Sequence, residues 1–388
     1  MCPWMEDNRE MKRPKQLLFL SNGYGEDAIA ARVAAELKKE FEILAFPLVG
    51  KGQAYRNSGI PVVGPLLELP SGGFNAHDFT ALRRDFEAGL FPLLGGQYRF
   101  LRKVQTDAVV AVGDFLAIAA AKLTKKKIFF IGANKSDFYL DRGARYLEIE
   151  LSLMKKWQVK VFPRDQKTQQ RLEKRGLDSE YLGNPMMDTF EGREEFENKK
   201  NKTVLLLPGS REEAYGNIRA MVPVVEGIHG KDPKILFGLA LAPSLRSEEL
   251  AIIFSSLGWV AAGNGFGKGE LSIALSRDFG QSLFSADLVI GMAGTANEQA
   301  VGLGKPVISW PGEGPQYSKR FALLQKQLLG EALNLLPYDP EGIAKKAIEI
   351  LNEGEYIESL REIGRERLGL PGAAVRIARR IEELFSSL

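Results

Sequence analysis

Residues 291–298 have the composition of a turn that binds phosphate. An apolar run precedes this Gly/Ala/Thr turn and a helical pattern of small residues follows it, which predicts a strand, a tight turn and a helix. The first N–H groups of that helix, near Gly294, Thr295 and Ala296, lack intrahelical partners and lie at the positive end of its dipole, so they attract phosphate. Glu298, about one turn further on, could accept hydrogen bonds from sugar hydroxyls. Close packing of strands and helix would favour the same small residues, and this stretch alone leaves both interpretations open.

A second loop of this kind lies at residues 208–211, directly after an apolar run. Gly209 lets the backbone approach a ligand closely, Ser210 offers a hydroxyl, and Arg211 can hold a phosphate through two N–H groups. A third loop, rich in proline and glycine, follows a later apolar run and contains Gln316. We expect all three loops at the carboxyl ends of parallel strands, where ligands bind in open α/β sheets.

Near the amino terminus, a compact apolar run is followed at once by the loop 21–27, which contains Gly23, Gly25, Glu26 and Asp27. The spacing is not the G-x-G-x-x-G of dinucleotide-binding proteins. The two carboxylates would compete with phosphate for the N–H groups of the next helix, so the loop suits a substrate with hydroxyls or an amine. A simpler interpretation is that Asp27 caps that helix.

Two further polar positions follow predicted strands in the first half of the chain. Asp114 comes just after the buried run 108–112, where a carboxylate can act as general base or bind a hydroxyl. It could equally cap the next helix. Asn134 lies in the polar loop 132–137 after the next apolar run, and we expect it at the same edge of the sheet.

Residues 82–104 mix aromatic and aliphatic side chains with basic ones. Such a segment could lie on an anionic membrane surface, with its rings among the headgroups and its basic groups against the lipid charge. A pair of ordinary helices with core-facing apolar sides and solvated basic sides fits the same pattern.

Residues 263–269 contain four glycines and Phe266, and we expect a loop there. The ring could stack on a nucleotide base, or the loop could simply be solvated. The sequence favours neither interpretation.

The composition excludes several classes of protein. The 388 residues include one cysteine, Cys2, and two distant histidines, His77 and His229, so neither a disulfide framework nor a zinc site is expected. Residues 1–190 hold 29 Lys+Arg against 23 Asp+Glu, giving +6, and the rest hold 23 against 26, giving −3. This distribution suits an anionic membrane or an acidic ligand, but no dense basic stripe indicates nucleic-acid binding. Without a signal peptide or an apolar run of about 20 residues, we expect a cytoplasmic protein, or one attached peripherally to the inner face of the membrane.

The order of predicted elements indicates an α/β fold with two Rossmann-like domains and parallel sheets. Two series of alternating apolar runs and helical patterns are separated by a highly charged stretch at 191–202. We therefore expect a tail at 1–15, an N-terminal domain at 16–188 and a C-terminal domain at 200–370. An amphipathic helix at 371–388 ends the chain.

These motifs together resemble the lipid-A-disaccharide synthase family of inverting, metal-independent glycosyltransferases, which have two facing Rossmann-like domains, the GT-B fold. The resemblance covers most of the chain and rests on Pro-Gly-Ser-Arg at 208–211 and Gly-Met-Ala-Gly-Thr-Ala-Asn-Glu at 291–298. Weaker matches lie at 21–27, at Gly-Asp-Phe 113–115 and at Tyr-Leu-Gly-Asn-Pro 181–185. The resemblance is closest to the lipid-A-disaccharide synthase-related group. The carboxyl half is also similar to the UDP-GlcNAc transferase that makes the lipid-linked disaccharide of peptidoglycan.

The resemblance implies a role for each motif. The C-terminal domain would bind a UDP-sugar of GlcNAc type as substrate, with Arg211 and the N–H groups of 294–296 against the diphosphate, Glu298 against the ribose and Gln316 against the donor sugar. The N-terminal domain would bind a lipid-type acceptor, with Asp114 as general base. The last helix would cross back to the first domain. No metal or cofactor would be needed, because oriented N–H groups and an arginine can stabilise the departing UDP.

The sequence departs from the family in places, and two other functions stay open. Ala293 stands where the family commonly has serine, and the family's tryptophan-rich segment after residue 131 is absent. A UDP-sugar 2-epimerase would use a similar pair of domains, although neither histidine follows a predicted strand at the ligand edge. A non-catalytic nucleotide-sugar-binding protein would need the donor motifs without Asp114.

Overall fold

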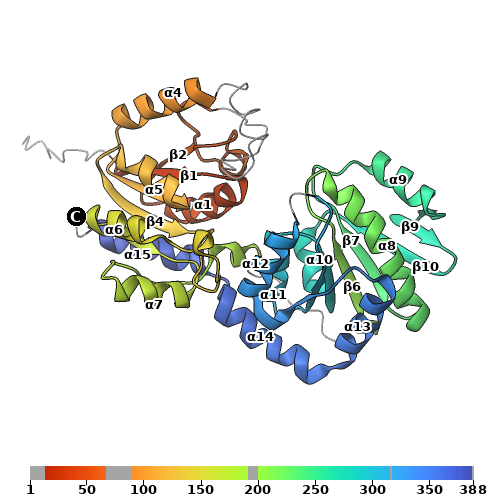
Figure 1. The fold of residues 1–388 in the computed structure, drawn as a ribbon. Coiled ribbons are helices and arrows are strands. Elements are labelled where there is room, and N and C mark those ends of the chain that lie inside the picture. Colours follow the sequence, from red (N-terminus) through yellow and green to blue (C-terminus); the bar gives the residue numbers. More distant parts are fainter. Residues whose placement is uncertain (1–13, 67–89, 191–199, 315–316, 387–388) are drawn as a thin grey trace, which may run out of the picture. The chain divides into compact units, whose positions relative to one another are not determined.

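The computed structural model describes residues 14–66, 90–190, 200–314 and 317–386 (Figure 1). Gln316, His77 and residues 82–89 of the amphipathic segment lie outside them. The described residues form two compact units. Unit 1 is drawn from residues 1–133, 152–162 and 374–388, and unit 2 from residues 134–151 and 163–373.

This division differs from the single boundary expected between residues 188 and 200. Residues 134–151 and 163–190 belong to unit 2 because their large apolar side chains enter its core. Phe138, Met187 and Phe190 are all buried there.

In the described part of unit 1, five parallel strands form a sheet in the order β2-β1-β3-β4-β5. They are β1 (Gln16–Ser21), β2 (Glu42–Pro47), β3 (Ala108–Gly113), β4 (Lys127–Gly132) and β5 (Lys160–Phe162). Leu17 to Leu20 are fully buried, because both faces of a parallel sheet are covered. The apolar runs predict these strands. The run at 60–63 forms only an isolated bridge, between Val62 and Ala45.

The described helices of unit 1 are α1 (Tyr24–Leu37), α2 (Gln53–Asn57), α4 (Leu90–Lys103), α5 (Phe115–Lys122) and α15 (Ala373–Ser386), and α6 (Glu148–Lys156) runs from unit 2 into unit 1. Helix α15 is the predicted helix that returns to the first domain. Its Phe385 packs edge-on against Phe41, with ring centroids 5.1 Å apart.

In the described part of unit 2, eight strands form a second sheet in the order β13-β12-β11-β6-β7-β10-β9-β8. They are β6 (Thr203–Leu207), β7 (Leu236–Ala240), β8 (Val260–Ala262), β9 (Gly265–Lys268), β10 (Leu271–Ser276), β11 (Leu288–Gly291), β12 (Val307–Ser309) and β13 (Leu333–Leu335). Six strands are parallel, while β9 and β8 extend the sheet antiparallel. The prediction of a loop at 263–269 is therefore wrong. Phe266 lies in β9 and is buried, and its ring stacks on that of Phe254 with centroids 4.2 Å apart.

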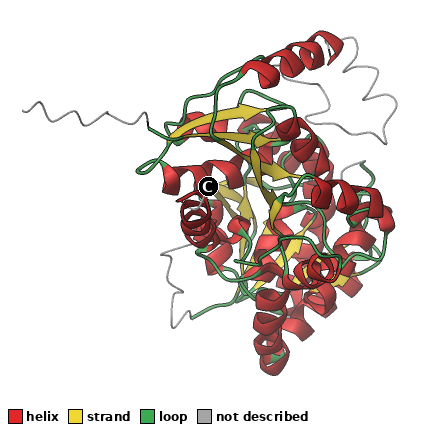
Figure 2. Cartoon of the chain, turned by 90° about the vertical axis from the view of Figure 1, so that its left-hand side faces the viewer, coloured by secondary structure: helices red, strands yellow, loops and turns green. Residues whose placement is uncertain are grey.

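Helices pack on both faces of the second sheet. Figure 2 draws the strands in yellow and the helices in red. The described helices of unit 2 are α7 (Gln166–Lys174), α8 (Glu213–Lys231), α9 (Ser247–Ser256), α10 (Phe279–Ser285), α11 (Thr295–Gly302), α12 (Lys319–Leu329), α13 (Pro340–Asn352) and α14 (Gly354–Leu368), with short 3-10 helices at Arg142–Ala144, Pro185–Phe190 and Gly330–Ala332. Successive side chains of a strand point to opposite faces. In β6, Val204 and Leu206 therefore enter the core formed with α8, α9 and α13, and Leu205 and Leu207 enter the core formed with α10, α11, α12 and α14. None of the described helices is long and apolar enough to cross a membrane.

Candidate functional site

Two of the predicted ligand loops meet at the carboxyl edge of the second sheet. Strands β6 and β11 are neighbours, with Gly291 opposite Leu207, and the N–H of Met292 donates to the Leu207 carbonyl over 2.8 Å. Gly209 has φ +103, and a Cβ on it would lie 3.3 Å from the Met292 carbonyl oxygen. The loop at 208–211 therefore packs on the loop after β11, as their sequences predict.

The loop after β12 joins the same edge. A Cβ on Gly312 would lie 2.9 Å from Cε of Met292 and 3.5 Å from Oδ1 of Asn217. Asn217, buried at the start of α8, donates from Nδ2 to the Pro208 carbonyl over 2.8 Å. These contacts bring all three predicted donor loops together, although Gln316 itself falls outside the described residues.

The loop after β7 supports Ser210. The hydroxyl of Ser244 donates to the Ser210 carbonyl over 2.5 Å. Ser210 and Arg211 are exposed at this edge. Among the described residues, the Arg211 side chain makes no hydrogen bond or ion pair, so its guanidinium is available to a ligand.

Helix α11 begins at Thr295, as the small-residue turn predicts. Gly294 is its N-cap and provides no side-chain cap for the first N–H groups. Thr295 is exposed, and Gly294 and Ala296 are half-buried. The open N–H groups and the helix dipole give this end of α11 an affinity for anions.

A buried amide network fixes the turn in front of α11. Asn297 donates from Nδ2 to the Gly291 carbonyl over 3.1 Å and to Oε1 of Gln325 over 3.0 Å. Gln325 donates from Nε2 to the Gly294 carbonyl over 2.8 Å, and the Tyr317 hydroxyl donates to Gln325 Oε1 over 2.6 Å. Burial raises the pKa of Tyr317 to about 12, although its hydrogen bonds with Ser309 and Asn297 oppose the rise. The hydroxyl therefore stays protonated at neutral pH and keeps donating.

This network engages the carbonyls of Gly291 and Gly294, and it was not predicted. Asn297 lies inside the predicted motif, but Gln325 is 28 residues further along the chain. Only the packing of α12 against the turn brings the two amides together.

Glu298 lies in the first turn of α11, but its carboxylate is already engaged. Nη2 of Arg164 contacts Oε2 of Glu298 at 2.6 Å, and the two side chains are 3% and 14% exposed. Burial works to lower the pKa of Arg164, but Glu298 and other neighbouring groups act more strongly together, so the pKa is raised. Arg164 was not predicted, because its partner is 134 residues away.

In unit 1, the predicted glycine loop is shorter than expected. Helix α1 begins at Tyr24, so Gly25, Glu26 and Asp27 form its first turn. Gly23 is the N-cap, and a Cβ on it would lie 2.3 Å from Oε2 of Glu26. The N-cap has no side chain to cap α1, and Asp27 lies inside the helix, so the interpretation of Asp27 as a helix cap is wrong.

Asp27 instead takes part in a buried polar cluster. It is 1% exposed and accepts a hydrogen bond from the Ser21 hydroxyl over 2.6 Å. The Ser21 oxygen also lies 2.7 Å from the Tyr55 hydroxyl oxygen. Burial raises the pKa of Asp27 to about 7; the Ser21 hydrogen bond opposes the rise and the charge of Glu26 adds to it. Asp27 is thus a partly protonated acid at neutral pH.

Asp114 occupies the carboxyl end of β3 and caps α5. Its Oδ1 accepts from the Leu116 N–H over 2.9 Å and from Nδ2 of Asn22 over 2.7 Å. Gly113 has φ +129, and a Cβ there would overlap Oδ1 of Asn22 at 1.8 Å. The capping interpretation is confirmed, and Asn22 is an additional partner that fixes the carboxylate.

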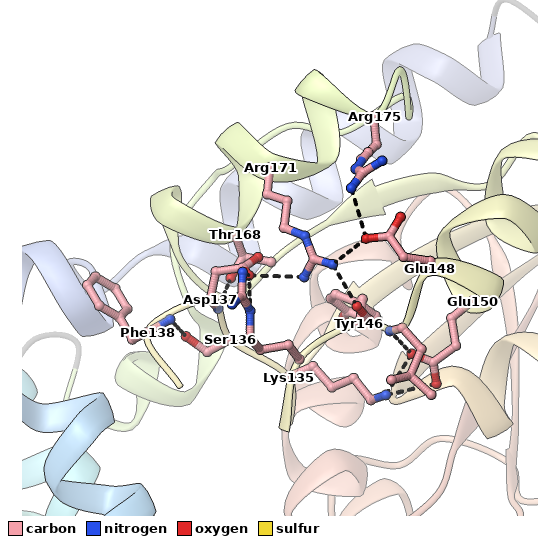
Figure 3. A network of polar contacts seen from close by, with 12 residues as sticks. Lys135, Ser136, Asp137, Phe138, Tyr146, Glu148, Glu150, Thr168, Arg171 and Arg175 are labelled. Atoms are coloured by element: carbon pink, nitrogen blue, oxygen red, sulfur yellow. Dashed lines mark hydrogen bonds and ion pairs between the residues drawn. The ribbon is translucent and has the colours of Figure 1, made fainter. Parts of the chain in front are cut away.

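Asn134 begins a stretch of unit 2 that a charged network holds in place (Figure 3). Nζ of Lys135 contacts both carboxylate oxygens of Glu150, at 2.8 and 2.7 Å. Nη1 of Arg171 donates to Oδ1 of Asp137 over 3.0 Å. Because the other acceptor-side residues belong to unit 1, neither unit by itself brings Asn134 together with them.

Among the described residues, no group of three or more His, Cys, Asp or Glu side chains is arranged to hold a metal ion.

Solved structures show that this architecture is the GT-B fold. The chain aligns with the calicheamicin glycosyltransferase CalG4 over 97% of its own length and 99% of the other, with TM-score 0.64 and 15% identity. A Listeria monocytogenes protein described as a UDP-N-acetylglucosamine 2-epimerase aligns over 96% and 98%, with TM-score 0.62 and 18% identity. The UDP-GlcNAc 2-epimerase of Neisseria meningitidis, solved with UDP-GlcNAc bound, aligns over 95% and 100%, with TM-score 0.59 and 16% identity. No protein-family model matches the sequence, and no curated protein matches it.

The protein therefore has two Rossmann-like α/β domains with parallel sheets and belongs by its fold to the GT-B class.

Proposed function

We propose that this protein is a glycosyltransferase that moves a sugar from a UDP-sugar to an acceptor. The observation that carries the proposal is the meeting of three loops at one edge of the second sheet, with an exposed Arg211 and the uncapped end of α11. Both features offer positive charge to a diphosphate. Neighbours of the same fold transfer sugars or bind a UDP-sugar, which supports a nucleotide-sugar donor.

The chemistry proposed for this edge is stabilisation of the leaving group. When the bond between the anomeric carbon and the diphosphate breaks, negative charge builds on the UDP oxygens. Arg211 and the N–H groups of Thr295 and Ala296 would stabilise that charge, because their orientation is fixed before the reaction by the amide network behind the turn. Gly209 would let the diphosphate reach the backbone.

Unit 1 would bind the acceptor and provide the general base. Asp114 would take the proton from an acceptor hydroxyl as that oxygen attacks the anomeric carbon from the face opposite UDP, which inverts the configuration. Asn22 and the Leu116 N–H hold Oδ1 of Asp114, so the direction of the carboxylate is fixed. A lipid-type acceptor and a GlcNAc-type sugar are the finer parts of the proposal, and they rest on the resemblance to lipid-A-disaccharide synthases.

Helix α4 is the surface proposed for contact with an anionic membrane. Leu93, Gln97 and Leu101 are buried, whereas Leu94 and Tyr98 are 39% and 49% exposed, and Arg99, Arg102 and Lys103 are exposed beside them. An exposed tyrosine ring, an exposed leucine and basic groups on one helix suit a peripheral association. Sedimentation with anionic liposomes should show binding that falls with added salt, and absence of binding would remove this part of the proposal.

A UDP-sugar 2-epimerase is the second candidate, because epimerases share the fold. The position of His229 argues against an epimerase mechanism that uses this histidine at the carboxyl edge of the second sheet. Helix α8 starts at Glu213 beside the ligand loops, and His229 lies 16 residues further on, which is roughly 24 Å along a helix. Product analysis separates the functions: release of UDP that requires an acceptor supports transfer, and epimerisation of the sugar without an acceptor contradicts it.

A further inference from the structure

Arg164 and Glu298 form an ion pair whose burial is not explained by a gain in stability. The Arg164 side chain is only 3% exposed, and that of Glu298 is 14% exposed. Moving a guanidinium and a carboxylate out of water costs several kcal/mol per ion, and apolar side chains of similar volume often give an equally stable core. A largely buried ion pair that holds Glu298, in the first turn of α11, therefore suggests a role in binding.

The two residues of this ion pair come from separate segments of unit 2. Arg164 stands between β5 and α7, directly before Asp165, whose carboxylate caps α7 and is itself buried. Glu298 belongs to α11, whose amino end adjoins the predicted diphosphate loops. The ion pair thus fixes the Glu298 side chain to the segment that starts α7, within unit 2.

We propose that Arg164 is a positioning residue for the nucleotide ribose, which holds Glu298 by one oxygen so that the other accepts ribose hydroxyls. The contact uses Oε2 of Glu298. A carboxylate has two oxygens and about four lone-pair directions, so Oε1 can still accept from a diol. This inference rests on the proposed UDP-sugar site.

A held carboxylate binds a diol better than a mobile one, because the rotamer freedom of the glutamate is already lost before the ligand arrives. Hydrogen bonds to a charged acceptor such as this ion-paired carboxylate are also stronger than those to a neutral acceptor. Loss of Arg164 should therefore weaken the contact with the ribose and leave the contacts with the diphosphate in place.

The test is the ratio of affinities for UDP and for its 2′-deoxy and 3′-deoxy analogues, measured by calorimetry. The wild type should prefer UDP to at least one analogue by about tenfold or more, as expected for a charged hydrogen bond. In Arg164→Met and in Glu298→Gln the preference should fall below about threefold, and the double variant should show no further fall. Arg164→Lys, which keeps the positive charge, should recover part of the preference for UDP.

Arg171→Met is the matched control, because Arg171 also forms ion pairs in unit 2, a partly buried one with Asp137 and an exposed one with Glu148 (Figure 3). The Arg171→Met variant should keep the wild-type ratio of affinities for UDP and its deoxy analogues. Unchanged preference in Arg164→Met together with loss in Glu298→Gln would overturn the inference, as would tighter UDP binding by Arg164→Met. If Arg164→Met unfolds at the assay temperature, the same ratio of affinities is measured for Arg164→Lys, and a ratio equal to that of the wild type would overturn the inference. A wild type that binds no UDP would remove the proposed function and this inference with it.

Discussion

A Cβ on Gly209 would lie 3.3 Å from the carbonyl oxygen of Met292, so the two predicted diphosphate loops touch through a position without a side chain. Gly209 also has φ +103, which other residues rarely adopt. We expect Gly209→Ala to destabilise the protein by about 1–3 kcal/mol and to weaken UDP binding. Urea denaturation and calorimetry measure the two effects.

Gly216→Ala is the control for this substitution. Gly216 lies within α8 and has nothing within 4 Å of an added Cβ. Alanine there should stabilise the helix by about 0.5–1 kcal/mol and leave UDP binding unchanged. Wild-type UDP affinity in Gly209→Ala would show that the 208–211 loop is not a ligand loop.

Arg211 is exposed at the edge of the second sheet and is the side chain proposed to bind the diphosphate. Arg211→Ala should weaken UDP binding by about 1.5–3 kcal/mol, or about 10–150-fold, because a charged hydrogen-bonding group is lost. Arg219→Ala, which removes another exposed arginine of the same region, should have little effect. Equal affinities for Arg211→Ala and the wild type in calorimetry would exclude Arg211 from the site.

Asp114 both caps α5 and is the proposed base, and two substitutions separate these tasks. Asparagine caps helices about as well as aspartate, so Asp114→Asn should keep the stability and lower kcat by about 10²–10⁴-fold. Asp114→Ala should also lose about 0.5–2 kcal/mol of stability. Full turnover by Asp114→Asn would leave Asp114 with the capping role alone.

The buried Asp27 predicts a pH dependence of stability. Its pKa rises from 3.8 to about 7 on folding, so between these values the folded state binds more protons than the unfolded state. The free energy of unfolding should therefore fall as the pH rises from about 4 to about 7, at up to about 1.4 kcal/mol per pH unit, and level off above. Asp27→Asn should flatten this slope in urea denaturation. An unaltered slope would mean that other groups cause the pH dependence.

The sequence predicts the parallel strands and the loops that follow them, because buried strands such as Leu17–Leu20 and Val204–Leu207 are continuous apolar runs. It also predicts that loops after parallel strands share one edge. The contact of Gly209 with Met292 follows from that rule, since β6 and β11 are neighbours.

Partners that are distant in the sequence could not be predicted. Arg164 meets Glu298, Asn297 meets Gln325 and Ser21 meets Tyr55 only because packing brings separate elements together. Phe266 was missed for a local reason. Its flanking glycines suggest a loop, whereas the antiparallel pairing of β9 with β8 and β10 decides the conformation.

The central claim is that unit 2 binds a UDP-sugar, and a thermal-shift panel of UDP-, GDP- and ADP-sugars tests it most directly. A ligand that binds the folded state alone raises its stability with concentration. UDP-sugars, and UDP itself, should raise the Tm in proportion to the logarithm of their concentration, while GDP- and ADP-sugars should not. Equal shifts for all three nucleotides, or none at millimolar ligand, would contradict the account.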